Sequence, residues 1–288
     1  RSIWVTGVQT CALPIFIVLI AFSGRGFVHL PKDVEIAMLT HEQKVGIFAI
    51  AQWGLASLQY FVMSIVLFFY LIDCLYAERK DRSILFWKSL PVSDWATVLS
   101  KVLVAAIVVP VGVYVLALVT DLLFTGIFRM SAGDSAVART LFTWDTEVWL
   151  RLQGLMLSGL AVAVLWYAPI AGYLLLVSAW ARRNVFLWAV LPPVLLLIGE
   201  EIAFDTDYVK ILLAHRLGGP WQNMGIVGGM ERIEDALEGD DATPRVAELL
   251  GTIDVWAVFQ SPGLWIGVAV AAVLIWGAIR IRRYRDDT

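Results

Sequence analysis

Five long runs without an Asp, Glu, Lys or Arg constrain this fold more than any other feature of the sequence. The runs cover residues 45–72, 102–120, 152–181, 184–199 and 255–279. A helix that spans a membrane needs about 20 mostly apolar residues. The fourth run reaches that length if it continues past Glu200 and Glu201 to Phe204. The five runs therefore predict membrane-spanning segments.

The composition also places the chain among integral membrane proteins. Hydrophobic residues make up 59% of the chain, its mean hydropathy is +0.76, and only 16% of its residues are charged. In a typical soluble domain about 25% of the residues are charged. The runs lack the period-two alternation of a lipid-facing strand, so we predict an all-α polytopic membrane protein.

The N-terminal residues are interpreted separately. Residues 5–15, VTGVQTCALPI, resemble the translated adapter of a sequencing library, so we interpret residues 1–15 as a leader unrelated to the fold. The following FIVLIAFSG predicts the outer end of a first span whose beginning is missing. We expect the natural protein to have six spans, with a further segment before them.

We predict a single transmembrane domain over residues 16–288. Its connections include a cytoplasmic loop over 73–97 and a long external loop over 205–257, before the last span. The spans are expected at about 16–23 (partial), 45–72, 98–124, 152–180, 184–204 and 258–280.

The distribution of Lys and Arg predicts the orientation of these spans. Eleven of them, against six Asp and Glu, lie in the connections at 73–101, 182–183 and 280–288. Ten, against nineteen, lie in the connections at 23–44, 121–151 and 200–254. Because cytoplasmic loops are enriched in Lys and Arg, both natural termini should be cytoplasmic. No basic stripe suits a phosphate backbone, so we expect no nucleic-acid partner.

The longest cytoplasmic connection contains AERKDRSILFWKSLPVSDW, residues 77–95. Its charged and aromatic residues predict a short amphipathic helix over about 82–89, which Pro91 should end. Ser93 is a suitable N-cap for the next helix, with Asp94 in the first turn. Two interpretations fit this pattern equally: a helix that rests in lipid headgroups, or a docking element for a soluble partner.

The stretch ERKDRSILFWKSLPVSDWATVLSK resembles the type 2 ABC exporter permeases over roughly residues 70–105. Elsewhere only the six-span plan and the long external loop match that family. The resemblance implies a coupling helix that inserts into a separate ATP-binding subunit. It implies that Pro91 and Ser93 set the geometry of this helix, and that the contact residues are Glu78, Arg79, Arg82, Phe86, Trp87 and Lys88. Many members have Gly and Thr after the charged pair, where this chain has Asp81, Arg82 and Ser83.

The same resemblance implies a permease subunit of an exporter in the bacterial cytoplasmic membrane. Its expected partners are the ATP-binding subunit, a second permease copy in a homodimer or heterodimer, and membrane lipid. ATP and Mg are expected in the ATP-binding subunit, because this chain has no GxxxxGK[ST] loop. We expect no catalytic residue, cofactor or metal site in the chain itself, and the transported substrate stays open.

Four prolines interrupt the predicted spans and are candidate hinges: Pro110, Pro169, Pro192 and Pro193. Ordinary kinks are the more common explanation of such prolines, because neighbouring groups can satisfy the freed carbonyls. Gly267 and Ala271 form a small-residue face that can pack closely against another helix, within the chain or across a dimer.

Two functions from other classes were also considered. GEEIAF places Glu200 and Glu201 together at a span end, as in intramembrane proteases with an EExxxR motif, but Asp205 stands at the sixth position. HEQKV has Val45 where a zinc motif needs its second His. A membrane anchor or sensor that docks a partner without ATPase activity is the main alternative to a permease.

Overall fold

The computed structural model describes residues 41–81, 93–131, 146–224 and 253–284, and all regular structure in these ranges is helical. Five helical segments there are long and apolar enough to cross a membrane: Gln52–Lys80, Asp94–Gly126, Trp149–Trp166, Val185–Phe204 and Pro262–Tyr284. The predicted all-α class is therefore confirmed over the described residues, and the five apolar helices support a multi-pass membrane protein. The first span expected at 16–23 lies outside these ranges.

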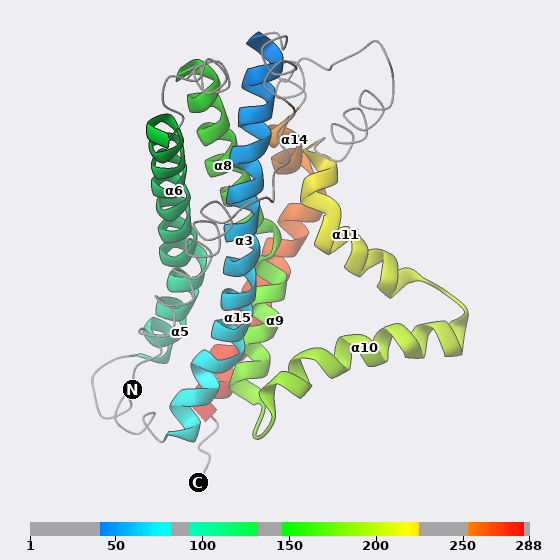
Figure 1. The fold of residues 1–288 in the computed structure, drawn as a ribbon. Helices are drawn as coiled ribbons and strands as arrows, with labels where there is room; N and C mark the ends of the chain where they lie inside the picture. The colour runs from blue at the N-terminus through cyan, green and yellow to red at the C-terminus, as the bar shows by residue number, and fades with distance from the viewer. Residues whose placement is uncertain (1–40, 82–92, 132–145, 225–252, 285–288) are drawn as a thin grey trace. The chain divides into compact units, whose positions relative to one another are not determined.

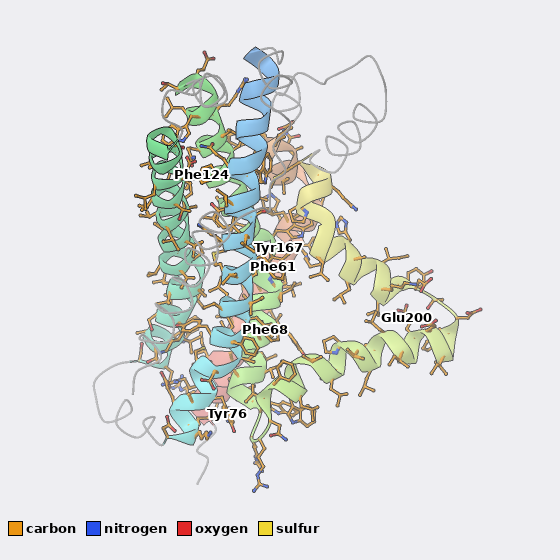
Figure 2. All side chains as sticks on the ribbon, viewed as in Figure 1. Phe61, Phe68, Tyr76, Phe124, Tyr167 and Glu200 are labelled. Carbon is orange, nitrogen blue, oxygen red and sulfur yellow. The ribbon has the colours of Figure 1, made fainter. Side chains whose placement is uncertain are left out.

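Many large apolar side chains point away from the packed helices. Phe61, Leu196 and Val273 are each more than 60% exposed, and Phe61 is labelled in Figure 2. Such surfaces are normal where lipid tails, rather than water, surround a helix. The exposed residues therefore agree with the membrane-spanning lengths of the helices.

By its contacts, the chain divides into two compact units. Among the described residues, unit 1 holds 41–66, 110–131, 146–158 and 253–254, and unit 2 holds 67–81, 93–109, 159–224 and 255–284. The division falls within the helices α3 (His41–Lys80) and α8 (Thr146–Trp166). We describe each unit by itself.

Unit 1 is built from parts of α3, α6 (Val109–Ser131) and α8. Its buried apolar residue Leu152 packs against Trp53, Leu155 and Ile253. Polar side chains, rather than a large apolar core, fill much of the space between its helices. They are Gln52, Gln59, Thr120, Asp121 and Gln153, each at most 8% exposed.

Unit 2 has the larger apolar core. Its helices α9 (Ala168–Trp180) and α15 (Pro262–Tyr284) lie side by side (Figure 1), and the end of α3 and α5 (Asp94–Leu103) pack against the same core cluster. A Cβ atom at Gly172 of α9 would lie 3.1 Å from the backbone oxygen of Ala271. The absence of a side chain at Gly172 therefore allows the close approach of α15. The small-residue face at Ala271 thus packs within the chain.

Two of the predicted prolines sit at irregular points of the backbone. A π-helix, η1 (Val104–Val108), lies directly before Pro110, because proline has no N–H to continue the regular ladder. The predicted span at 152–180 is not one helix: α8 ends at Trp166 and α9 begins at Ala168, with Pro169 in its first turn. Proline is tolerated there because the first N–H groups of a helix have no partner within the helix.

The predicted external loop at 205–257 contains regular structure. Helix α10 (Val185–Phe204) includes Pro192 and Pro193, and after a turn at Asp205 the chain continues as α11 (Tyr208–Asn223). Helix α14 (Val255–Gln260) closes the region. Figure 1 shows α10 and α11 as the two arms of a V, and Glu200 lies near its apex in Figure 2.

Glu200 explains how α11 begins. Its carboxylate accepts hydrogen bonds from the Val209 N–H at 2.6 Å and from the Thr206 hydroxyl at 3.0 Å. The residue before α11, Asp207, makes no side-chain cap. A carboxylate that accepts an unpaired N–H at a helix N-terminus stabilises the helix. A side chain from α10 thus caps α11, which a reading of the local sequence did not anticipate.

Candidate functional site

The end of α3 and the start of α5 flank residues 82–92, the segment in which the sequence predicts a short amphipathic helix. Helix α3 continues to Lys80, and α5 begins at Asp94. Ser93 is the N-cap of α5, with φ −74° and ψ 149°, and its hydroxyl accepts a hydrogen bond from the Ala96 N–H at 3.2 Å. The N-cap predicted at Ser93 is confirmed. The other candidate contact residues, Arg82, Phe86, Trp87, Lys88 and Pro91, lie outside the described residues.

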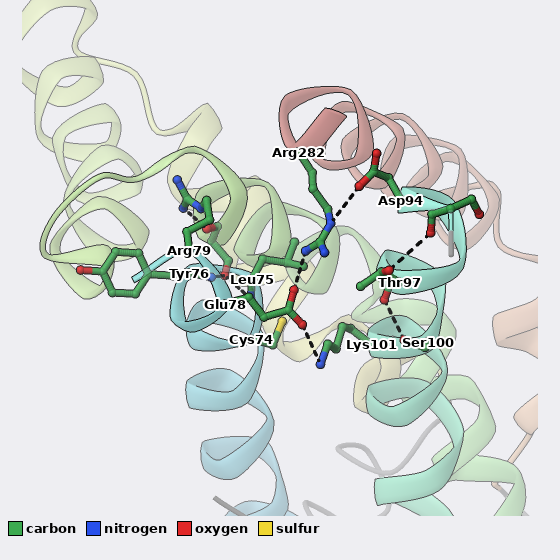
Figure 3. Close-up of polar contacts among 12 residues, drawn as sticks. Cys74, Leu75, Tyr76, Glu78, Arg79, Asp94, Thr97, Ser100, Lys101 and Arg282 are labelled. Atoms are coloured by element: carbon green, nitrogen blue, oxygen red, sulfur yellow. Dashed lines mark hydrogen bonds and ion pairs between the residues drawn. The ribbon is translucent and has the colours of Figure 1, made fainter. Parts of the chain in front are cut away.

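Four charged side chains form a network beside this segment (Figure 3). Arg282 Nη1 of α15 donates to Glu78 Oε2 of α3 at 2.5 Å, and Arg282 Nε donates to Asp94 Oδ1 of α5 at 3.2 Å. Lys101 Nζ of α5 lies 3.2 Å from Glu78 Oε1. The side chains of Arg282 and Glu78 are only 4% and 11% exposed. The network joins both flanks of the segment to the last helix.

Burial makes this network sensitive to change. Removing one partner of a buried ion pair leaves the other charge desolvated and unbalanced, which costs far more than losing an exposed pair. In the described ion pairs, two carboxylates face two cations. The arrangement specifies how α3, α5 and α15 meet.

Arg79 connects the end of α3 to the end of α9 through hydrogen bonds. Its Nη2 donates to the carbonyl oxygens of Ser178 at 2.6 Å and Ala181 at 2.9 Å, at the end of α9. The last carbonyls of a helix have no partner within the helix, and a cation there also opposes the negative end of the dipole. Arg79 therefore caps the C-terminus of α9.

The buried Ser178 hydroxyl completes this junction. Its Oγ accepts hydrogen bonds from the N–H groups of Leu75 and Tyr76, each at 3.1 Å. The Ser178 side chain has no exposed surface, so only a small residue fits between α3 and α9. The end of α3 is thus held by polar contacts on two sides.

Replacing Ser178 with alanine should lower the free energy of unfolding by about 1 kcal/mol, because the hydroxyl of a buried hydrogen bond is lost. The matched control is Ser100→Ala, since Ser100 is exposed and its hydroxyl bonds only to Thr97 of its own helix. Thermal unfolding of both purified variants in detergent checks this expectation. Equal melting temperatures for the two variants would contradict it.

The contacts of Glu78, Arg79 and Arg282 bring together helix ends that the charge pattern assigned to one side of the membrane. They are the end of α3 and the start of α5, the end of α9 before Arg182 and Arg183, and the basic end of α15. Within unit 2, the polar contacts of Glu78, Arg79 and Arg282 place these ends next to one another (Figure 3).

Sequence reasoning identified some of these residues but not their contacts. Glu78 and Arg79 were expected to contact a partner, and in the structure both make contacts within the chain. Arg282 and Ser178 were not singled out. No local signal separates the buried Arg282 from its exposed neighbours Arg280 and Arg283, since all three belong to the same basic helix end.

The protease-like residues are held in structural contacts. Glu200 caps α11, and the His215 ring packs edge-on against Trp166 at 5.5 Å between ring centroids. Among the residues that the structure describes, no group of three or more His, Cys, Asp and Glu side chains is placed to hold a metal ion.

No protein-family model, no curated protein and no solved structure matches this chain. The structure itself therefore defines the class: a helical chain with membrane-spanning lengths and a buried charge network beside residues 82–92.

Proposed function

We propose that this chain is the transmembrane permease subunit of an ATP-driven exporter. ATP hydrolysis by a separate ATP-binding subunit would drive the movement of substrate. The resemblance of residues 70–105 to type 2 ABC exporter permeases supports this function. The observation that carries it is the buried network that fixes both flanks of residues 82–92.

A coupling element works only if force applied to it reaches the spanning helices. A flexible loop would change its own conformation without moving the helices. Packed helices joined by buried ion pairs instead move together between discrete arrangements. Movement of residues 82–92 would act on Glu78 at one flank and Asp94 at the other, and both bind Arg282. The network therefore gives the segment a direct mechanical connection to α15.

The proposed roles of the flanking residues follow from their contacts. Glu78 and Arg79 position the start of the segment, because their described contacts bind α15 and α9. Ser93 and Asp94 position its end through the N-cap and the ion pair. The partner-contacting surface is then left to the segment's own side chains, with Phe86 and Trp87 as its apolar centre.

The proposal includes the remaining partners of such a transporter. ATP and Mg belong to the ATP-binding subunit, and a second permease copy completes the transport unit in a bacterial cytoplasmic membrane. The charge network lies on the cytoplasmic side in this arrangement. Pro110 and Pro169, at irregular points of the backbone, are the candidate hinges with structural support.

The test is co-purification of this chain with a candidate ATP-binding subunit. The variant Phe86→Ala plus Trp87→Ala should reduce capture at least tenfold, because large aromatic side chains supply most of the binding free energy at such interfaces. Capture is measured from detergent-solubilised membranes that contain both subunits.

A matched control replaces the same residue types elsewhere, in Phe61→Ala plus Trp256→Ala. Phe61 and Trp256 are 64% and 74% exposed and lie outside residues 82–92. The control should capture the subunit as the parent does. Undiminished capture by the Phe86 and Trp87 variant would contradict the docking site. Failure of the parent to capture the subunit would instead favour a membrane anchor or sensor with a different partner.

A further inference from the structure

A second polar cluster lies in unit 1, separate from the network at residues 78–101. Helices α3, α6 and α8 turn polar side chains toward one another there, within segments of membrane-spanning length. The cluster consists of Gln52, Gln59, Thr120, Asp121 and Gln153, each buried. The proposed function uses none of them, so the inference below does not depend on that function.

Asp121 is the centre of the cluster. One carboxylate oxygen, Oδ1, accepts a hydrogen bond from the Gln52 amide. The other, Oδ2, accepts from Trp149 Nε1 at 2.7 Å and from Gln153 Nε2 at 3.4 Å. Three N–H donors arranged around one carboxyl group favour its ionised form. Burial opposes ionisation, so Asp121 carries a negative charge only where a positive charge balances it.

Two amide oxygens in the same cluster have no donor. Gln52 Oε1 and Gln59 Oε1 are buried without a hydrogen-bond partner among the described residues, although Gln59 Nε2 donates to Thr120 Oγ1 at 3.0 Å. Both glutamines are at most 4% exposed. A buried acceptor without a donor costs about 1–3 kcal/mol, so a species that these oxygens can bind would stabilise the site.

The unpartnered oxygens and the carboxylate share one cavity. Gln52, Gln59, Thr120, Asp121 and Gln153 line it, and its volume is about 10 Å³. A space of about 10–15 Å³ holds one water-sized particle. The occupant is therefore a single small species that contacts oxygen atoms.

Charge decides between a neutral and a charged occupant. The described contacts of the Asp121 carboxylate come from Gln52, Trp149 and Gln153, all uncharged. An ionised carboxylate at membrane depth without a counter-charge is strongly unfavourable. Oxygen ligands suit hard cations, and one carboxylate balances one positive charge. A divalent ion would leave an excess positive charge. With water in the cavity, Asp121 would have to be neutralised by a proton, although both of its oxygens accept N–H hydrogen bonds. One monovalent cation both balances the carboxylate and binds the unpartnered amide oxygens.

We propose that this cavity binds a small monovalent cation, of the size of Na⁺, through Asp121, Gln52 and Gln59. The cation joins α3 to α6 and thereby stabilises unit 1. Direct binding to the purified protein in detergent, measured with radioactive sodium, should saturate. Thermal unfolding in sodium chloride should occur at a higher temperature than in choline chloride of equal ionic strength, because a ligand of the folded state stabilises it.

The variants test the assignment to these residues. Asp121→Asn should abolish both the sodium binding and the sodium-dependent rise in melting temperature. Gln59→Leu should weaken sodium binding on the order of tenfold, as loss of supporting groups does at metal sites. The matched control is Asp73→Asn, since Asp73 is an exposed carboxylate of α3, and it should respond to sodium as the parent does.

Three results would overturn the proposal. They are a parent that binds no sodium, a parent that melts at the same temperature in both salts, and an Asp121→Asn variant that keeps the full response. A parent whose melting temperature follows pH but not sodium would assign a proton to Asp121 instead, which also overturns it. If Asp121→Asn does not fold, the binding measurement on the parent and on Gln59→Leu still decides.

Discussion

Replacing Arg282 with methionine is expected to lower the free energy of unfolding by about 3–5 kcal/mol, the usual cost of removing one partner from a buried ion pair. The Arg282 side chain is 4% exposed and binds Glu78 at 2.5 Å and Asp94 at 3.2 Å. Without it, these two carboxylates face only Lys101 among the network's cations. Methionine keeps much of the side-chain volume, so the loss reflects charge rather than packing.

The matched control is Arg283→Met, one position along the same helix. Arg283 is exposed, so its replacement should change the free energy of unfolding by less than about 0.5 kcal/mol. Thermal unfolding in detergent compares the two variants. The double variant Glu78→Gln plus Arg282→Met should lose less than the sum of the single variants, because the two side chains interact directly. Similar melting temperatures for Arg282→Met and Arg283→Met would show that the network contributes little to stability.

Truncating Trp166 to alanine is expected to cost about 3–5 kcal/mol, as for other fully buried tryptophans. Trp166 has no exposed surface, and its Nε1 donates to the Arg216 carbonyl at 2.9 Å. The Arg216 guanidinium lies 5.0 Å from the ring centre and donates back to the Trp166 carbonyl at 3.3 Å. A Cβ atom at Gly219 would come within 2.5 Å of the ring. The ring therefore fills the space where α11 meets the end of α8.

Trp166→Phe separates the two contributions of this side chain. It keeps an aromatic ring but loses the N–H donor, so about 1–3 kcal/mol of the effect should remain from the unsatisfied Arg216 carbonyl. Burial also lowers the pKa of the Arg216 guanidinium from its usual value, although arginine stays protonated at neutral pH. The Arg216 contacts therefore persist across the pH range in which the variants are compared.

The control for Trp166 is Trp95→Ala, since Trp95 of α5 is 54% exposed. Its loss should have little effect on the melting temperature of the purified protein. Limited proteolysis gives a second measurement, because Trp166→Ala should expose the α10–α11 region to cleavage before global unfolding. Equal stability of the Trp166 and Trp95 variants would show that the junction of α11 with α8 does not stabilise the fold.

The proposed sodium site illustrates a feature that sequence analysis missed. The sequence placed Asp121 near the end of the span predicted at 98–124, and in the structure it lies inside the segment Asp94–Gly126, which is long enough to span a membrane. A single acid near the end of an apolar run gives no sign of its depth. Its partners Gln52 and Trp149 lie 69 and 28 residues away in the sequence, so their convergence could not be read from spacing.

The features that the sequence predicted correctly depend on residues that are close together along the chain. The preference of an apolar run for lipid is a sum over its own residues, so helices of spanning length follow directly from 45–72, 102–120 and the other runs. The Ser93 N-cap needs only the backbone three residues away. Proline lacks an N–H wherever it stands, so irregular backbone near Pro110 and Pro169 was also predictable.

Only the tertiary structure decided which polar groups meet. Arg282 and Glu78 are 204 residues apart, and neither differs in its local sequence from exposed charged neighbours such as Arg283 and Lys80. Contacts with α11 also form at the break between α8 and α9. Trp166 and Tyr167 there donate hydrogen bonds to the backbone carbonyls of Arg216 and Leu217. The physical reason is that charge pairing and burial depend on distance in space. Hydropathy, capping and proline effects depend on neighbours along the chain.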